Sequence, residues 1–205
     1  MNKKTIIVDY GVGNLGSVQN ALVHLGKEAK ISNDPKEIAS AEIVILPGQG
    51  AFQTAMDHLR TKNLIDPITN HIQAKKPFLG ICVGFQVLFE KSEEMGNHKG
   101  LGLFPGTLKK FKDPSLKIPH MGWNQLHFKN NTSYEKALGQ KAQVYFVHSY
   151  YLDQTPTDLV LANTDYGQQF VAAIQRENLL ATQFHPEKSG DVGLSLLDHF
   201  FKTLT

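Results

Sequence analysis

Pro77-Phe78-Leu79-Gly80-Ile81-Cys82-Val83-Gly84 combines a short apolar run with a cysteine between two glycines. Such a run predicts a buried β-strand, and the glycines allow the backbone to turn sharply into a helix that begins at Val83. The spacing matches a nucleophile elbow, in which this turn exposes a reactive side chain at the end of a strand. A thiol is an effective nucleophile when a base or a helix N-terminus stabilises its thiolate. The stretch therefore predicts an α/β fold with a nucleophile at Cys82, although a free cysteine is also common as an inert core residue.

Composition narrows the classes of protein to which the chain can belong. The 205 residues include 21 Lys and Arg against 19 Asp and Glu, and a net charge of +2 gives no strong field to attract nucleic acid or an anionic membrane. A single cysteine excludes an intramolecular disulfide and a multi-cysteine zinc site. The apolar run near the N-terminus is too short for a signal peptide or a membrane span. We therefore expect a soluble cytoplasmic protein without nucleic-acid or membrane partners, and we expect no metal or cofactor.

Strand-like runs alternate with helix-like segments in the first half, whereas short β-like runs rich in Gly and Pro follow residue 96. This order predicts an open, mostly parallel α/β sheet flanked by helices, with additional antiparallel strands in the C-terminal half. Without a repeat or a linker, residues 1–205 are expected to form a single domain. Strands are expected at 5–9, 29–32, 43–46, 77–81, 106–111, 125–128, 144–147, 159–162, 170–175 and 180–183, and helices at 14–24, from 34, at 51–60, 64–75, 83–91 and 191–204.

A base for Cys82 is predicted late in the chain, in Gln183-Phe184-His185-Pro186-Glu187. Pro186 favours an extended backbone at His185, and residues two apart on an extended chain face the same side. Glu187 can therefore hold one nitrogen of the imidazole, as the third group of a catalytic triad does. The motif is weak alone, but together with the elbow it predicts a Cys-His-Glu triad.

Acyl transfer at Cys82 also needs donors for the oxyanion of a tetrahedral intermediate. The backbone N–H of Val83 is one candidate. Leu46-Pro47-Gly48-Gln49-Gly50 follows another predicted strand, at the sheet edge where open α/β folds bind ligands. We expect the second donor from this loop, at Gln49 and Gly50.

These three motifs, in this order, resemble the class I glutamine amidotransferases over nearly the whole chain. The resemblance implies that Cys82 attacks the side-chain amide of glutamine, that His185 passes a proton to the departing ammonia and that Glu187 orients His185. It also implies glutamine-binding roles for Gly50, Gln86, Glu94, Ser149 and Tyr150. Gln49 departs from the valine typical of this loop, which leaves the backbone role intact but alters its side chain.

Three further segments resemble the glutaminase subunits of imidazole glycerol phosphate synthases within that class. They are Asp9-Tyr10-Gly11-Val12-Gly13-Asn14-Leu15, Pro119-His120-Met121-Gly122-Trp123-Asn124 and Tyr145-Phe146-Val147-His148-Ser149-Tyr150. The resemblance implies a heterodimer with a (β/α)8-barrel cyclase, to which the chain delivers ammonia for histidine biosynthesis. It places Asn14, Pro119, His120, Met121, Trp123 and Asn124 at or near that interface.

A dinucleotide site is a competing interpretation of the N-terminal segment. Gly11-Val12-Gly13-Asn14-Leu15-Gly16 is a literal G-x-G-x-x-G after a strand, and Asp34 lies near the distance expected of a ribose-binding acid. The β-rich texture after residue 96 argues against the second half that a dinucleotide needs. The sequence is also compatible with a glutaminase of another pathway and with a non-catalytic regulatory module that carries an oxidation-sensitive thiol.

Overall fold

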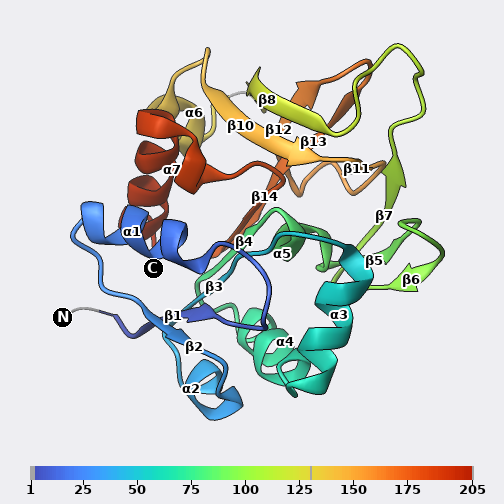
Figure 1. Cartoon of the computed structure of the whole chain (residues 1–205). Coiled ribbons are helices and arrows are strands. Elements are labelled where there is room, and N and C mark those ends of the chain that lie inside the picture. The colour runs from blue at the N-terminus through green and yellow to red at the C-terminus, as the bar shows by residue number, and fades with distance from the viewer. Residues whose placement is uncertain (1–2, 130, 205) are drawn as a thin grey trace.

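A computed structural model describes residues 3–129 and 131–204, and a large twisted sheet crosses its centre (Figure 1). Most neighbouring strands of this sheet are consecutive in the sequence, and helices cross over between the parallel ones. In spatial order its strands are β2 (Lys30–Ser32), β1 (Thr5–Val8), β3 (Ile43–Leu46), β4 (Phe78–Ile81), β14 (Leu179–Thr182), β13 (Gln169–Arg176), β12 (Val160–Asp165) and β9 (His127–Phe128).

The sheet is parallel from β2 to β14 and antiparallel from β14 to β9. Every residue of β1, β3, β4 and β14 is buried, as expected of parallel strands covered on both faces. Figure 1 shows α1 and α7 on one side of the sheet and α3 and α4 on the other. The helices are α1 (Leu15–His24), α2 (Pro35–Ala39), α3 (Phe52–Thr61), α4 (Ile65–Gln73), α5 (Val83–Gln86), α6 (Ser133–Leu138), α7 (Gly190–Lys202) and the 3-10 helix η1 (Pro186–Lys188).

Two smaller sheets complete the fold beside the antiparallel part of the large one. One pairs β8 (His120–Gln125) with β10 (Gln143–His148). The other joins β11 (Tyr150–Leu152), β7 (Phe104–Lys110), β5 (Phe89–Ser92) and β6 (His98–Lys99) in that order. Within the part of the chain that the structure describes, no helix is long and apolar enough to cross a membrane.

The predicted fold class is confirmed, and most element bounds agree within a few residues. The expected helix over 83–91 is wrong, because α5 ends at Gln86 and the chain enters β5 at Phe89. The apolar run Val87-Leu88-Phe89 favours helix and strand alike, and pairing of β5 with β6 and β7 decides for the strand. The expected strand over 125–128 is β8 and β9 separated by the buried Leu126.

The glycines of the elbow are required by close backbone packing. A side chain at Gly84 would overlap the carbonyl oxygen of Leu46 at the end of β3. A Cβ at Gly80 would lie 2.8 Å from the carbonyl oxygen of Gly84. The end of β3 and the first turn of α5, which carry the predicted site, are therefore packed backbone to backbone.

We expect Gly84→Ala to destabilise the protein by about 3 kcal/mol or more, because backbone atoms must move to admit the methyl group. Urea unfolding measures the change in free energy. Gly16→Ala in α1 is the matched control, since a Cβ there meets no atom within 4 Å among the described residues. It should stabilise by roughly 0.5–1 kcal/mol, and equal stability of the two variants would contradict the packing argument.

Candidate active site

Cys82 occupies a strained turn between β4 and α5. Its φ and ψ are 55° and −106°, a conformation that L-residues rarely adopt. Its N–H donates to the carbonyl oxygen of Thr182 at 2.7 Å, so β14 holds the turn in place. As predicted, α5 begins at Val83, directly after the cysteine.

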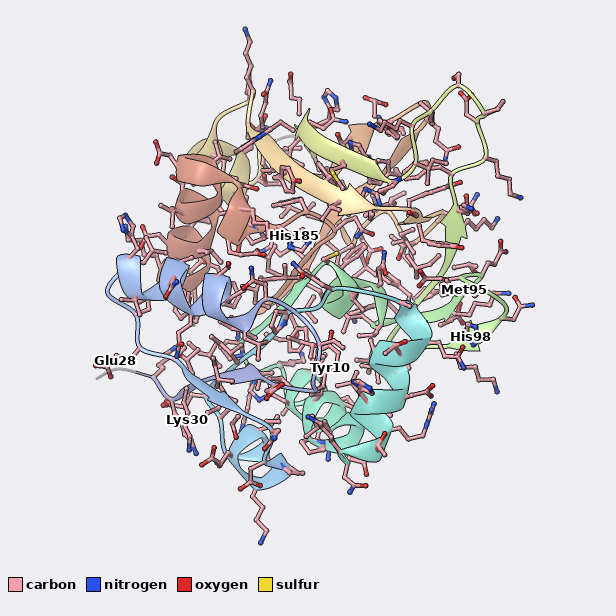
Figure 2. All side chains as sticks on the ribbon, viewed as in Figure 1. Tyr10, Glu28, Lys30, Met95, His98 and His185 are labelled. Atoms are coloured by element: carbon pink, nitrogen blue, oxygen red, sulfur yellow. The ribbon has the colours of Figure 1, made fainter. Side chains whose placement is uncertain are left out.

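His185 and Glu187 form a hydrogen-bonded pair at the end of β14. Nδ1–H of His185 donates to Oε1 of Glu187 at 2.8 Å, and the side chains are only 1% and 2% exposed. His185 is extended as predicted, whereas Glu187 reaches it from the 3-10 turn η1. The Ser189 hydroxyl donates to the carbonyl of His185 at 2.7 Å and accepts from the N–H of Tyr145 at 2.9 Å. Figure 2 shows His185 in the interior, between β10 and the elbow.

The surroundings of His185 favour its protonated form. Burial alone lowers the pKa of this imidazole, but its interactions with Cys82 and then with Glu187 outweigh burial and raise the pKa to about 10. The other ring nitrogen, Nε2, is buried. The arrangement suits an imidazole that takes a proton near Cys82 while Glu187 stabilises the resulting charge.

A cavity of about 360 Å³ opens in front of Cys82 and brings together the residues that the sequence assigned to catalysis and substrate binding, except Glu187, which lies behind His185. Segments from the elbow, the glycine-rich loop, the turn after β5 and the start of β11 contribute to it. Its lining comprises Gln49, Gly50, Cys82, Val83, Gln86, Glu94, Pro119, Val147, His148, Ser149, Tyr150, His185 and Lys188. Val147, His148 and Lys188 are additions that the sequence motifs did not single out as substrate-binding residues.

Gln86 and Glu94 reach the cavity but already have partners in the protein. The amide nitrogen of Gln86 donates to the carbonyl oxygen of Tyr150 at 3.2 Å and to Oε1 of Gln183 at 3.0 Å. Oε2 of Glu94 accepts the N–H of Phe52 at 2.6 Å, at the start of α3. Glu94 thereby fixes the helix that follows the glycine-rich loop.

Tyr10 is a neighbour of this loop that the motif analysis did not assign to the site. A side chain at Gly48 would overlap the Tyr10 hydroxyl and the side chain of Val83, so loop and elbow are in close contact. The hydroxyl is buried and has no hydrogen-bond partner within residues 3–129 and 131–204. Burial, and then the nearby Cys82, raise the pKa of Tyr10. The feature of the sequence that could have indicated a place for Tyr10 in the site is its position just after β1, at the carboxyl edge of the sheet.

The segment 119–124 presents two faces. Met121 and Trp123 are 62% and 55% exposed, and Trp123 packs edge-on against Tyr145. His120 is buried, and its Nδ1 lies 3.0 Å from Nε2 of His148. The segment therefore combines an exposed apolar surface with a buried polar connection.

The glycine-rich segment 11–16 follows a strand and precedes a helix, as a dinucleotide-binding motif does. However, the polar side chains that would bind the dinucleotide already accept hydrogen bonds from the backbone. Oδ1 of Asn14 accepts from Ser17 N–H at 3.1 Å and caps α1, while Oδ1 of Asp34 accepts from Lys36 N–H at 2.8 Å and caps α2. A Cβ at Gly13 would lie 3.5 Å from the Cα of Gly48. The segment thus packs against the loop of the candidate active site.

Comparisons with known proteins identify the family of the chain. The family model "Glutamine amidotransferase class-I" matches residues 6–204. A solved glutamine amidotransferase has a TM-score of 0.75 with 19% identity, covering 96% of this chain and 97% of that one. PurLQS from Thermotoga maritima has a TM-score of 0.73 with 18% identity, covering 98% and 99%. The fold is shared, and the chain belongs to the class I glutamine amidotransferases.

Curated relatives define the family more narrowly. Imidazole glycerol phosphate synthase subunit HisH of Syntrophotalea carbinolica is 45% identical over 201 residues, which cover 95% of this chain and 98% of the relative. The HisH subunit of Aquifex aeolicus is 48% identical over 198 residues, covering 96% and 95%. Within its class, the chain therefore falls in the family of HisH subunits of imidazole glycerol phosphate synthase.

The buried histidines His120 and His148 predict how stability changes at acid pH. Burial lowers the pKa of His120 from 6.5 to about 4, and burial together with nearby charge lowers that of His148 to about 3. Between these values and 6.5 the unfolded chain binds more protons than the folded protein. Their contribution to stability is therefore complete above pH 6.5 and is lost as the pH falls toward 4 and then 3.

We expect His148→Phe to reduce the acid-side slope of stability against pH by up to about 1.4 kcal/mol per pH unit. The substitution keeps an aromatic ring among Phe111, Phe146 and Phe170 but removes one titrating group. Urea unfolding between pH 4 and 7 measures the slope for both proteins. Identical slopes would contradict the neutral state of His148.

Proposed function

We propose that this chain is the glutaminase subunit of an imidazole glycerol phosphate synthase, hydrolysing L-glutamine to glutamate and ammonia. The observation that carries the proposal is the juxtaposition of Cys82 with the buried His185–Glu187 pair at one end of an open cavity. The family of the chain and its HisH relatives support the same activity.

In the first half-reaction, the thiolate of Cys82 attacks the side-chain carbonyl carbon of glutamine. The oxyanion that forms is held by the N–H of Val83 and by the loop at Gln49 and Gly50. His185 then protonates the amide nitrogen as the C–N bond breaks, which releases ammonia and leaves a thioester on Cys82. Glu187 fixes the ring and stabilises its positive charge.

In the second half-reaction, water replaces ammonia. His185 accepts a proton from the water, whose oxygen attacks the thioester carbonyl, and the collapse of the intermediate returns the thiolate and frees glutamate. Gln86, Glu94, Ser149 and Tyr150 line the same cavity and would hold the amino-acid end of the substrate.

Ammonia released into neutral water is largely protonated and lost as a nucleophile, so the product needs a directly docked acceptor. The HisH relatives are named as subunits of a synthase. The acceptor that we propose is a separate cyclase subunit of (β/α)8-barrel fold. It would make imidazole glycerol phosphate and aminoimidazole carboxamide ribotide in the cytoplasm. The exposed Met121 and Trp123, together with Asn14, form the surface we assign to this partner.

We expect Cys82→Ala to lower glutamate release by more than about 10³-fold, because the thioester can no longer form. Glutamate production in the presence of the cyclase and its nucleotide ligand provides the measurement. A diazo ketone analogue of glutamine should label the wild-type protein at Cys82 and leave the variant unmodified. Residual turnover at the wild-type rate would exclude the triad, whereas a wild-type protein that releases no glutamate and is not labelled would favour a regulatory module.

We expect Trp123→Ala to weaken cyclase binding by about 30-fold, since an exposed aromatic anchor typically contributes ~2 kcal/mol at an interface. Stimulation of glutamine hydrolysis by the cyclase should fall with it, whereas hydrolysis without the cyclase should stay unchanged. Val23→Ala, at an equally exposed position on α1, is the control. Unchanged affinity and stimulation in Trp123→Ala would rule out this surface.

A further inference from the structure

Gln183 is a buried residue in contact with the nucleophile that the motif analysis did not assign to the site. Its side-chain nitrogen donates to Sγ of Cys82 at 3.8 Å, and its Oε1 accepts from Gln86 at 3.0 Å. A donor aimed at sulfur favours the thiolate, whereas the amide oxygen would repel it. The orientation of this one amide therefore bears on the reactivity of Cys82.

A continuous series of hydrogen bonds connects Gln183 with β8. Gln86 donates to the carbonyl oxygen of Tyr150 as well as to Gln183. The same carbonyl lies 2.8 Å from Nδ1 of His148. Nε2 of His148 lies 3.0 Å from Nδ1 of His120, whose Nε2 is 3.4 Å from the amide nitrogen of Asn124.

The direction of every bond in this series is determined by its two ends. At Asn124, Nδ2 donates to the carbonyl of Asp165 at 2.7 Å and Oδ1 accepts from Gln125 N–H at 2.8 Å, which fixes the amide. Nε2 of His120 must then accept, so its Nδ1–H donates to His148. His148 in turn donates from Nδ1–H to Tyr150. Both rings are neutral at physiological pH, because burial lowers their pKa values.

At the other end, the carbonyl of Tyr150 can only accept. It therefore holds the nitrogen of Gln86 toward itself, and that nitrogen in turn holds Oε1 of Gln183. The remaining group of Gln183, its N–H, is left facing Cys82. Among the described residues, the other titratable groups near the sulfur are His185 and Tyr10, with Glu94, His148, Tyr150 and Lys188 on the cavity wall.

We propose that Gln183 is a positioning residue that stabilises the thiolate of Cys82, and that the hydrogen-bond series from Asn124 through His120 and His148 fixes the Tyr150 carbonyl, which through Gln86 holds the Gln183 amide in the donating orientation. The inference rests on the proposed function, in which Cys82 is the nucleophile. It also gives β8 a regulatory meaning: Met121 and Trp123 face outward, while His120 and Asn124 lead inward. A partner that shifts β8 would thereby change the reactivity of Cys82.

The first test is the rate of Cys82 alkylation by iodoacetamide as a function of pH. In Gln183→Met, which keeps the length of the side chain, the inflection should move up by about one pH unit and alkylation at pH 7 should slow roughly tenfold. Gln175→Met, at a half-buried position on β13, is the control and should leave the profile unchanged. An unmoved inflection in a folded Gln183→Met protein would overturn the proposal.

The second test asks whether the series acts as a unit. His148→Phe should shift the same inflection upward. Combining it with Gln183→Met should add little, because both substitutions interrupt the same series of hydrogen bonds. Additive shifts, or no shift in a folded His148→Phe protein, would overturn the connection. Should the variants fail to fold, ¹⁵N NMR of the wild-type histidines decides. Both must be Nδ1–H tautomers at pH 7, and an Nε2–H signal from either contradicts the assigned direction.

These measurements separate the inference from the function on which it rests. Alkylation reports the thiolate whether or not glutamine is the substrate. If the wild-type protein with its cyclase releases no glutamate, the proposed function is wrong, while a shifted alkylation profile in Gln183→Met would still support the role of Gln183. If the wild type has glutaminase activity but the alkylation profile of Gln183→Met is unmoved, only the inference about Gln183 is wrong.

Discussion

The close backbone contact between Gly84 and the carbonyl of Leu46 determines where the rest of the site can lie. It joins the end of β3 to the first turn of α5, which follows β4 directly. The glycine-rich loop after β3 is thereby held beside the cysteine after β4, and both stand at the carboxyl edge where open α/β sheets place their ligands. β14, the next parallel strand, brings His185 to the same edge.

Histidines of this protein differ in charge because their partners differ. His185 meets a carboxylate and a thiol, and these interactions outweigh the cost of burying a cation. His120 and His148 are surrounded mainly by Phe111, Phe146, Phe170 and neutral polar groups, so burial prevails, aided at His148 by the nearby charge of His185, and the rings stay neutral. A single residue type thus supplies a charged acid–base group and neutral hydrogen-bonding links within one small region of the fold.

The sequence was informative where local spacing carries the chemistry. The elbow at Cys82 and the His-Pro-Glu motif could be recognised directly, because each places its groups within five residues. The length of α5 could not be predicted, since the pairing of β5 with distant strands overrides an ambiguous apolar run. Gln183 and Tyr10 were missed as members of the site for a related reason. Each follows or ends an apolar strand in an ordinary way, and only the tertiary fold brings it to the sulfur or to the loop.

The two faces of β8 have a consequence for how such a protein can change. Because successive residues of a strand point to opposite sides, substitutions at 121 and 123 alter the proposed docking surface without touching the hydrogen-bonded residues at 120 and 124. Partner choice and control of the nucleophile can then vary independently, although they share six residues of one strand. An engineer who wished to pair this glutaminase with a new ammonia acceptor would therefore redesign the odd-numbered positions and preserve the even ones.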